Sequence, residues 1–244
     1  MKKCLIYIYL LLLTSLCCLQ AGAVSSEIRS LSVSDGLPDL VINTIYKDSK
    51  GYVWMGTNTS VERFDGIRLE HYMVEGSNEN LKRVFALVEM PGNELWVGTG
   101  MGLFRLADDA EKLERLAPEM ITSGVHAFCK LGDVLYVGTE KGLYVYKGGV
   151  FEHVLVDKNI FSRANFVTGM VEGENGILWL STMGGLKSLR LSDQSITSFS
   201  DKLAKNGQNL SFYNITRIGS KIFMGTMTSG LVLFDTASKH FSRY

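Results

Sequence analysis

The stretch Gly51-Tyr-Val-Trp-Met-Gly-Thr57 decides the fold of this chain, because four further copies of its second half follow. The copies read Trp96-Val-Gly-Thr99, Tyr136-Val-Gly-Thr139, Trp179-Leu-Ser-Thr182 and Phe223-Met-Gly-Thr226. The five threonines lie 42, 40, 43 and 44 residues apart. A period of about 42 residues is what one four-stranded propeller blade consumes. The sequence therefore predicts an all-β fold, a β-propeller of five repeats.

Each copy contains four short apolar runs separated by turn residues. In the second copy, Val84–Val88 is followed by the turn Pro91-Gly-Asn93, then by the runs Glu94–Val97, Leu103–Leu106 and Lys112–Leu116. Short apolar runs between Gly, Pro and Asn indicate antiparallel strands. The expected blades cover residues 41–73, 83–117, 124–156, 165–200 and 213–244.

The repeated residues have structural interpretations. The aromatic residue stands at the same place in a strand of every blade, which favours a role in the core between neighbouring sheets over a sugar-stacking platform. The threonine that follows is interpreted as a turn residue whose hydroxyl satisfies nearby backbone groups.

One segment fits inside no repeat. Residues 27–33 have the pattern of an outer strand that precedes the first blade, while the fifth repeat already has its own outer strand at 239–244. The leading strand therefore lacks a blade to join, and we expect an incomplete ring, in a fragment of a longer propeller. A self-contained five-bladed ring with a spare first strand is the alternative, and a defunct truncated product is a third reading.

The N-terminus has the features of a cleaved export signal. A basic start at Lys2-Lys3, an apolar run over 5–13 and the site Ala21-Gly-Ala23 predict a signal peptide over 1–23 and a propeller over 24–244. A lipoprotein site at Cys17 or Cys18 is the alternative. The predicted location is the periplasm, where the remaining Cys129 has no partner for an internal disulfide and is read as a small buried hydrophobe.

The net charge and the hydropathy of the chain limit which binding partners are expected. Without Lys2 and Lys3 the chain has 23 basic against 25 acidic residues, a net charge of −2. No basic stripe appears, so nucleic acid is not expected as a partner. No later run of 18 or more apolar residues occurs, so no membrane anchor is expected after the signal.

The first repeat resembles a known family. The segments Ser34-Asp-Gly-Leu-Pro38, Ile45–Thr57 and Arg63-Phe-Asp-Gly66 resemble the two-component regulator propeller repeats in the periplasmic sensor region of Bacteroidetes hybrid two-component histidine kinases. The similarity covers about residues 28–244 and weakens in later repeats, where Ser181 replaces a Gly and Phe223 a Trp. It implies a sensor of oligosaccharides, with a second propeller and signalling domains, or a dimer partner, as further partners. The kinase module of such relatives is absent from this sequence.

Catalytic and cofactor chemistry is not expected. The four histidines come from different blades without metal-ligand spacing, and Gly98–Gly102 joins two strands, so it offers no helix N-terminus for a phosphate. We expect no catalytic residue, no metal and no cofactor.

A ligand site is expected in the loops that lead into each first strand. These loops supply amides, guanidiniums and a ring that suit hydroxyl-rich ligands, and ordinary solvated loops are the alternative interpretation. The candidate residues are Asn80, Arg83, Arg163, Asn165, Tyr213 and Asn214. The competing function is a secreted propeller enzyme, a polysaccharide lyase or glycosidase, which would need acid and base residues converging at the channel mouth.

Overall fold

The computed structural model describes residues 30–74, 81–199 and 210–244. The chain divides into two units, Met1–Ser32 and Val33–Tyr244. The predicted signal peptide and the candidate Asn80 lie outside the described residues. Within the second unit the fold is all-β, with two short 3-10 turns, η2 (Val33–Asp35) and η3 (Arg163–Asn165).

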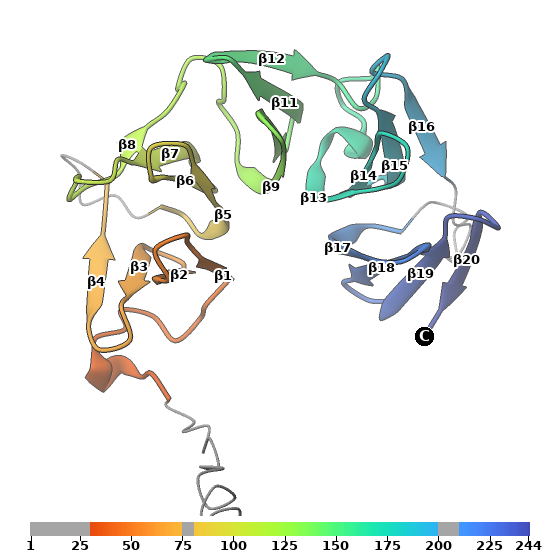
Figure 1. Cartoon of the computed structure of the whole chain (residues 1–244). Helices are drawn as coiled ribbons and strands as arrows, with labels where there is room; N and C mark the ends of the chain where they lie inside the picture. The colour runs from red at the N-terminus through yellow and green to blue at the C-terminus, as the bar shows by residue number, and fades with distance from the viewer. Residues whose placement is uncertain (1–29, 75–80, 200–209) are drawn as a thin grey trace, which may run out of the picture. The chain divides into compact units, whose positions relative to one another are not determined.

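Five antiparallel sheets of four strands follow one another in chain order (Figure 1). In each sheet the strands pair in sequence, so every repeat is one meander. The first two blades consist of β1 (Thr44–Lys47), β2 (Val53–Gly56), β3 (Val61–Phe64), β4 (Leu69–Tyr72), and of β5 (Val84–Met90), β6 (Glu94–Thr99), β7 (Gly102–Leu106), β8 (Glu114–Arg115). The third and fourth consist of β9 (Val125–Leu131), β10 (Val134–Thr139), β11 (Gly142–Lys147), β12 (Val150–Val154), and of β13 (Val167–Glu172), β14 (Ile177–Thr182), β15 (Gly185–Arg190), β16 (Ile196–Phe199). The fifth consists of β17 (Phe212–Ile218), β18 (Lys221–Thr226), β19 (Leu231–Asp235) and β20 (His240–Arg243).

The predicted propeller of five blades is confirmed. The first strand of each sheet contacts the first strand of the next, which brings β1, β5, β9, β13 and β17 into one series. Among the described residues, extensive strand contacts join each sheet to the next but do not join the fifth sheet to the first. The ring is therefore incomplete, as the sequence led us to expect.

The extended strand expected at 27–33 is not formed in its described part. Residues 30–32 are irregular, Val33 begins η2, and residues 27–29 are not described. A strand needs a neighbouring strand to satisfy its N–H and C=O groups. No described strand pairs with this segment.

The recurrent threonine is a turn residue in all five blades, as predicted. Its hydroxyl donates to the carbonyl oxygen of the residue that begins the next strand or precedes it, at 2.7–3.1 Å. The same oxygen accepts a backbone N–H from inside the turn, as Thr139 does from Lys141 at 3.1 Å. One side chain thus satisfies two backbone groups that the turn would leave unpaired.

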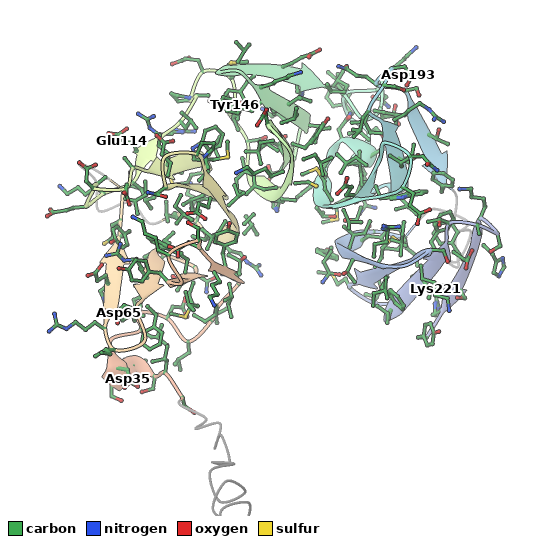
Figure 2. All side chains as sticks on the ribbon, viewed as in Figure 1. Asp35, Asp65, Glu114, Tyr146, Asp193 and Lys221 are labelled. Carbon is green, nitrogen blue, oxygen red and sulfur yellow. The ribbon has the colours of Figure 1, made fainter. Side chains whose placement is uncertain are left out.

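The recurrent aromatic residue packs between blades, again as predicted. Trp54, Trp96, Tyr136 and Trp179 are each at most 8% exposed, and each lies in a cluster with residues of the following blade. The ring centroids of Trp96 and Tyr146, for example, are 4.8 Å apart across the junction of the second and third blades. Figure 2 labels Tyr146 on the third blade. The inter-blade core is therefore built from the same repeat position four times.

Candidate ligand-binding cavity

The first strands of all five blades line one cavity of about 550 Å³. Seventeen residues surround it, and every blade contributes. They are Asn43, Thr44, Arg83, Phe85, Ala86, Leu87, His126, Ala127, Phe128, Phe166, Thr168, Gly169, Met170, Met183, Tyr213, Asn214 and Ile215.

A β-bulge at the same place in four of these strands turns one side chain toward the cavity. The pairing register shifts around Phe85, His126, Thr168 and Tyr213, each of which lies between two paired residues and has no partner of its own. In the first blade Asn43 holds the corresponding place, just before β1, and its N–H donates to Gly56 O at 2.8 Å. Bulges re-aim single side chains and are common beside binding sites. All five of these residues line the cavity.

Ring faces form a continuous row on one side of the cavity. The Phe85 and His126 ring centroids are 4.1 Å apart, and those of His126 and Phe166 are 4.7 Å apart. Arg83 extends the row, with its guanidinium 5.4 Å from the centre of the Phe85 ring. Burial lowers the pKa of His126, against the opposing effect of its hydrogen-bond partner Glu140, so the imidazole is mainly uncharged at neutral pH.

A chain of hydrogen bonds holds the Arg83 side chain. Arg83 Nε donates to Asn43 Oδ1 at 2.9 Å, Asn43 Nδ2 donates to Asn58 Oδ1 at 3.1 Å, and Asn58 Nδ2 donates to Asp39 Oδ2 at 2.8 Å. The first of these bonds joins residues of two neighbouring blades. Arg83 is therefore positioned before any ligand arrives, which lowers the entropy lost on binding.

The backbone before β5 is strained. Lys82 and Arg83 have φ values of 47° and 76°, in a region that residues other than glycine seldom adopt. Gly100 has no side chain, so the backbone at Lys82 can pass close to it. A Cβ at position 100 would lie 2.2 Å from the Lys82 carbonyl oxygen. Such strain persists only where the surroundings hold it, and it is concentrated at binding sites.

Of the five predicted site residues that the structure describes, three line the cavity and two do not. Arg83, Tyr213 and Asn214 line the common cavity. Tyr213 is 40% exposed, while Asn214 Oδ1 accepts the Gly225 N–H at 2.9 Å and so also supports the bulge.

Arg163 and Asn165 do not line the cavity. Arg163 Nη2 donates to Ser211 Oγ at 2.7 Å. Asn165 is 1% exposed, and its amide bonds to Asp157 N, Asp157 O and Asn159 O. The Asn165 side chain is thus committed to the loop that precedes η3.

Asn43, Phe85, His126 and Phe166 are cavity residues that the sequence analysis did not select. For the bulged positions a signal exists: they stand 13 or 14 residues before the repeat threonine in every copy, as Phe85 does relative to Thr99. Phe166 follows the loop of η3, and the sequence carries no comparable sign of its place.

The cavity offers hydrogen-bond donors, amides and ring faces. Its described lining contains one guanidinium, from Arg83, and no Asp or Glu. Among the described residues there is also no group of three or more His, Cys, Asp or Glu side chains that could hold a metal ion. In the part of the chain that the structure describes, no helix has the length and apolar character required to cross a membrane.

The fold and the cavity define a propeller with a polar and aromatic recess at the meeting of its first strands. Residues 36–59 match the two component regulator propeller family, which confirms the resemblance found in the first repeat. No curated protein matches this sequence.

Solved structures share the fold. The extracellular domain of one hybrid two component system from B. thetaiotaomicron is 19% identical with a TM-score of 0.73, over 85% of this chain and 28% of that chain. A second from the same organism is 22% identical with a TM-score of 0.71, over 88% and 31%. An ancestral GH74 enzyme is 15% identical with a TM-score of 0.63, over 83% and 31%. The chain thus spans less than a third of each of these proteins.

Proposed function

We propose that this chain is a ligand-recognition propeller of a periplasmic sensor, and that the ligand binds in the cavity described above. The observation that carries the proposal is the bulge repeated in four blades, which, with Asn43 at the corresponding place in the first blade, brings one side chain from each blade to the same cavity. A packing role alone would not need five different side chains, Asn43, Phe85, His126, Thr168 and Tyr213, at equivalent positions. The match of residues 36–59 to the two component regulator propeller family supports a sensing role.

The lining favours an oligosaccharide as the ligand. The ring faces of Phe85 and Phe166 can stack against the C–H faces of pyranoses, and Arg83 and Asn43 present polar groups to hydroxyls beside them. The cavity volume of about 550 Å³ lies within the range of small-molecule sites. Signalling across a membrane would require domains beyond this propeller.

Binding without cleavage is the function that the cavity supports best. Glycoside hydrolysis uses two carboxyl groups on either side of the scissile bond. The described lining of this cavity offers none. The GH74 similarity therefore contributes to the assignment of the fold, while the proposed activity is recognition.

Calorimetric titration of the chain without residues 1–23 against a panel of oligosaccharides tests the proposal. We expect saturable binding of one glycan, weakened about tenfold or more by Arg83→Ala and by Tyr213→Ala, since each change removes a direct contact. Arg68→Ala and Tyr244→Ala are matched controls, because both side chains are exposed and neither lines the cavity. Circular dichroism first establishes that each variant is folded. Binding that survives both cavity changes would place the ligand elsewhere and contradict the proposal.

A further inference from the structure

The three tryptophans of this chain occupy one repeat position, and their indole N–H groups differ in their partners. Trp54 Nε1 donates to Asp48 Oδ2 at 2.7 Å, and Trp96 Nε1 donates to Glu94 Oε2 at 3.1 Å. In the first blade the accepting carboxylate comes from the turn between the first two strands, and in the second blade it comes from the first residue of β6. No described residue accepts a hydrogen bond from the indole N–H of Trp179, although this residue is only 5% exposed. A buried donor without an acceptor is costly.

The missing acceptor has a structural cause. Gly173 occupies the position in the fourth blade that Asp48 occupies in the first. In each case the backbone N–H donates to the carbonyl oxygen four residues later, from Gly173 to Ile177 and from Asp48 to Tyr52. A Cβ on residue 173 would lie 2.6 Å from Trp179 Nε1. The position that supplies a carboxylate to Trp54 therefore has no side chain beside Trp179.

A cavity of about 340 Å³ opens at this tryptophan, between the fourth and fifth blades. Its charged lining is Glu174, Arg190, Arg217 and Lys239. Arg217 Nη1 donates to Glu174 Oε1 at 3.0 Å, so these two charges are paired. No described residue accepts a hydrogen bond from the side chain of Arg190 or Lys239, although the charge of Arg190 interacts with that of Asp193, whose carboxylate bonds to Ser195. Arg190 and Lys239 thus leave side-chain hydrogen-bond donors available at the cavity.

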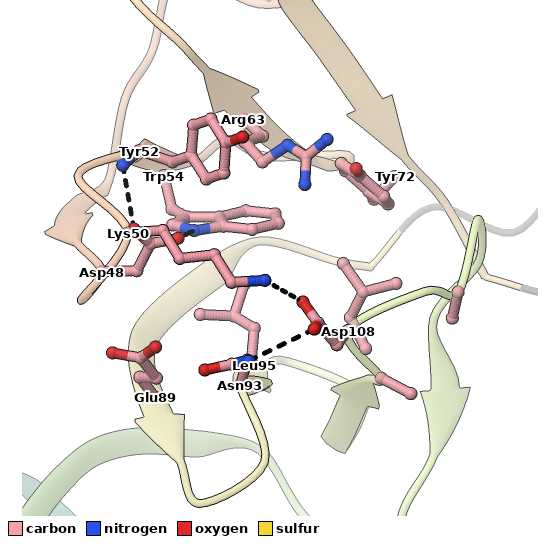
Figure 3. Close-up of a pocket in the computed structure, with 13 residues that line it drawn as sticks. Asp48, Lys50, Tyr52, Trp54, Arg63, Tyr72, Glu89, Asn93, Leu95 and Asp108 are labelled. Carbon is pink, nitrogen blue, oxygen red and sulfur yellow. Dashed lines mark hydrogen bonds and ion pairs between the residues drawn. The ribbon is translucent and has the colours of Figure 1, made fainter.

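The equivalent junction of the first and second blades shows what a satisfied site looks like (Figure 3). There Asp48 accepts from Trp54, Lys50 pairs with Asp108, and the free volume is about 20 Å³. Acceptor and counter-charge are both built into the protein in that junction. Between the fourth and fifth blades no described side chain accepts from the Trp179 indole, and neither Arg190 nor Lys239 has a hydrogen-bonded carboxylate partner.

We propose that the cavity at Trp179 binds the carboxylate of a sugar acid. A carboxylate only accepts hydrogen bonds, so its two oxygens can accept from the Trp179 indole N–H and from the Arg190 guanidinium at the same time. The ring faces of Trp179 and Phe199, whose centroids are 5.2 Å apart, supply apolar surface for a pyranose. Lys239 Nζ lies 5.7 Å from the centres of both rings, which adds positive charge at the same place. This site is separate from the proposed cavity at the first strands.

Nuclear magnetic resonance of the three indole N–H groups tests the proposal. In 15N-labelled protein, with peaks assigned by single Trp→Phe variants, we expect glucuronate to shift the Trp179 indole proton downfield and to leave those of Trp54 and Trp96 in place. Glucose and the methyl ester of glucuronate should have no such effect, since neither carries a carboxylate. A Trp179 shift produced equally by glucose, or absent with millimolar glucuronate, would overturn the proposal.

Variants of Arg190 and Lys239 complete the test. Arg190→Gln and Lys239→Gln should each weaken glucuronate binding about tenfold, because each removes a charge-assisted contact. Arg68→Gln and Lys158→Gln are matched exposed controls outside this cavity and should bind as the unchanged protein does. Undiminished binding by both cavity variants overturns the assignment, as does a response to an acidic peptide but not to glucuronate. In the Arg83→Ala variant the Trp179 indole peak should still shift with glucuronate. A failure of this proposal can therefore be distinguished from a failure of the proposed function.

Discussion

At the scale of single residues, Cys129 is a half-buried thiol on β9 without a disulfide partner. Burial, and next the charge of Glu172, raises the pKa of this thiol to about 11. Because the thiolate is the reactive form, about one molecule in a thousand is reactive at pH 8. The side chain therefore behaves as a small apolar group, which is how the sequence analysis interpreted it.

We expect native Cys129 to resist alkylation. Iodoacetamide at pH 8 should modify it at least about 100-fold more slowly than an unperturbed cysteine. Mass spectrometry of the peptide that contains residue 129 measures the extent of labelling over time, with the urea-unfolded chain as the fully labelled control. Labelling of the folded protein at the rate of the unfolded control would show an accessible, activated thiol instead.

At the scale of elements, β15 differs from its counterparts in a way that affects stability. Lys187 pairs with Leu180, as Phe104 pairs with Val97 and Tyr144 with Val137, so a cation stands where β7 and β11 carry aromatic side chains. It is 6% exposed, and its Nζ donates to Ser198 Oγ at 2.8 Å. Burial lowers the pKa of Lys187 below its usual 10.5, with Asp157 opposing the shift. The folded state therefore releases this proton more easily than the unfolded chain.

The sign of the pH dependence follows from that difference. Since the unfolded chain binds the proton more tightly, the Lys187 contribution to stability rises as pH increases from the lowered pKa toward 10.5. Lys187→Met should raise the free energy of unfolding at pH 7 by about 1 kcal/mol and reduce the gain between pH 7 and pH 10. Urea unfolding at both values measures this, with the exposed Lys221→Met as control. A less stable Met variant would show that the bond to Ser198 outweighs the cost of burying the charge.

The sequence predicted the elements better than it predicted the site. The repeated aromatic and threonine positions gave five blades, because identical local patterns fold into identical meanders. Arg83, Tyr213 and Asn214 line the cavity, although Tyr213 and Asn214 lie within β17 and not in the loop before it, where the sequence analysis placed them. Phe85 and His126 were missed, since a bulge that turns them toward the cavity is a property of backbone pairing and not of residue type. Asn165 was selected for its amide, whose bonds to residues 157 and 159 depend on the path of its loop.

At the scale of the whole molecule, the blades share one rule of assembly. Each of the first four packs two residues against the following blade. These are the repeat aromatic and the aliphatic residue of the third strand that pairs with the residue before the repeat threonine. Those aliphatic residues, Val61, Leu103, Leu143 and Leu186, are 0% exposed. In the fifth blade the equivalent Leu231 is 41% exposed, and Phe223 is only half-buried. Within the described residues, this face is not covered as the other four are.

The rule predicts unequal costs for the same kind of substitution. Trp96→Ala, in a closed junction, should lower the free energy of unfolding by about 3–5 kcal/mol, because it leaves a cavity in a packed core. Phe223→Ala should cost about 1 kcal/mol or less, since the side chain has neighbours on one side only. Urea unfolding of both variants at several protein concentrations measures the difference. If Phe223→Ala proved as costly as Trp96→Ala, the face would be covered in solution. A cost that grew with protein concentration would identify a second copy of the chain as the cover, whereas a constant cost would assign that role to the chain itself.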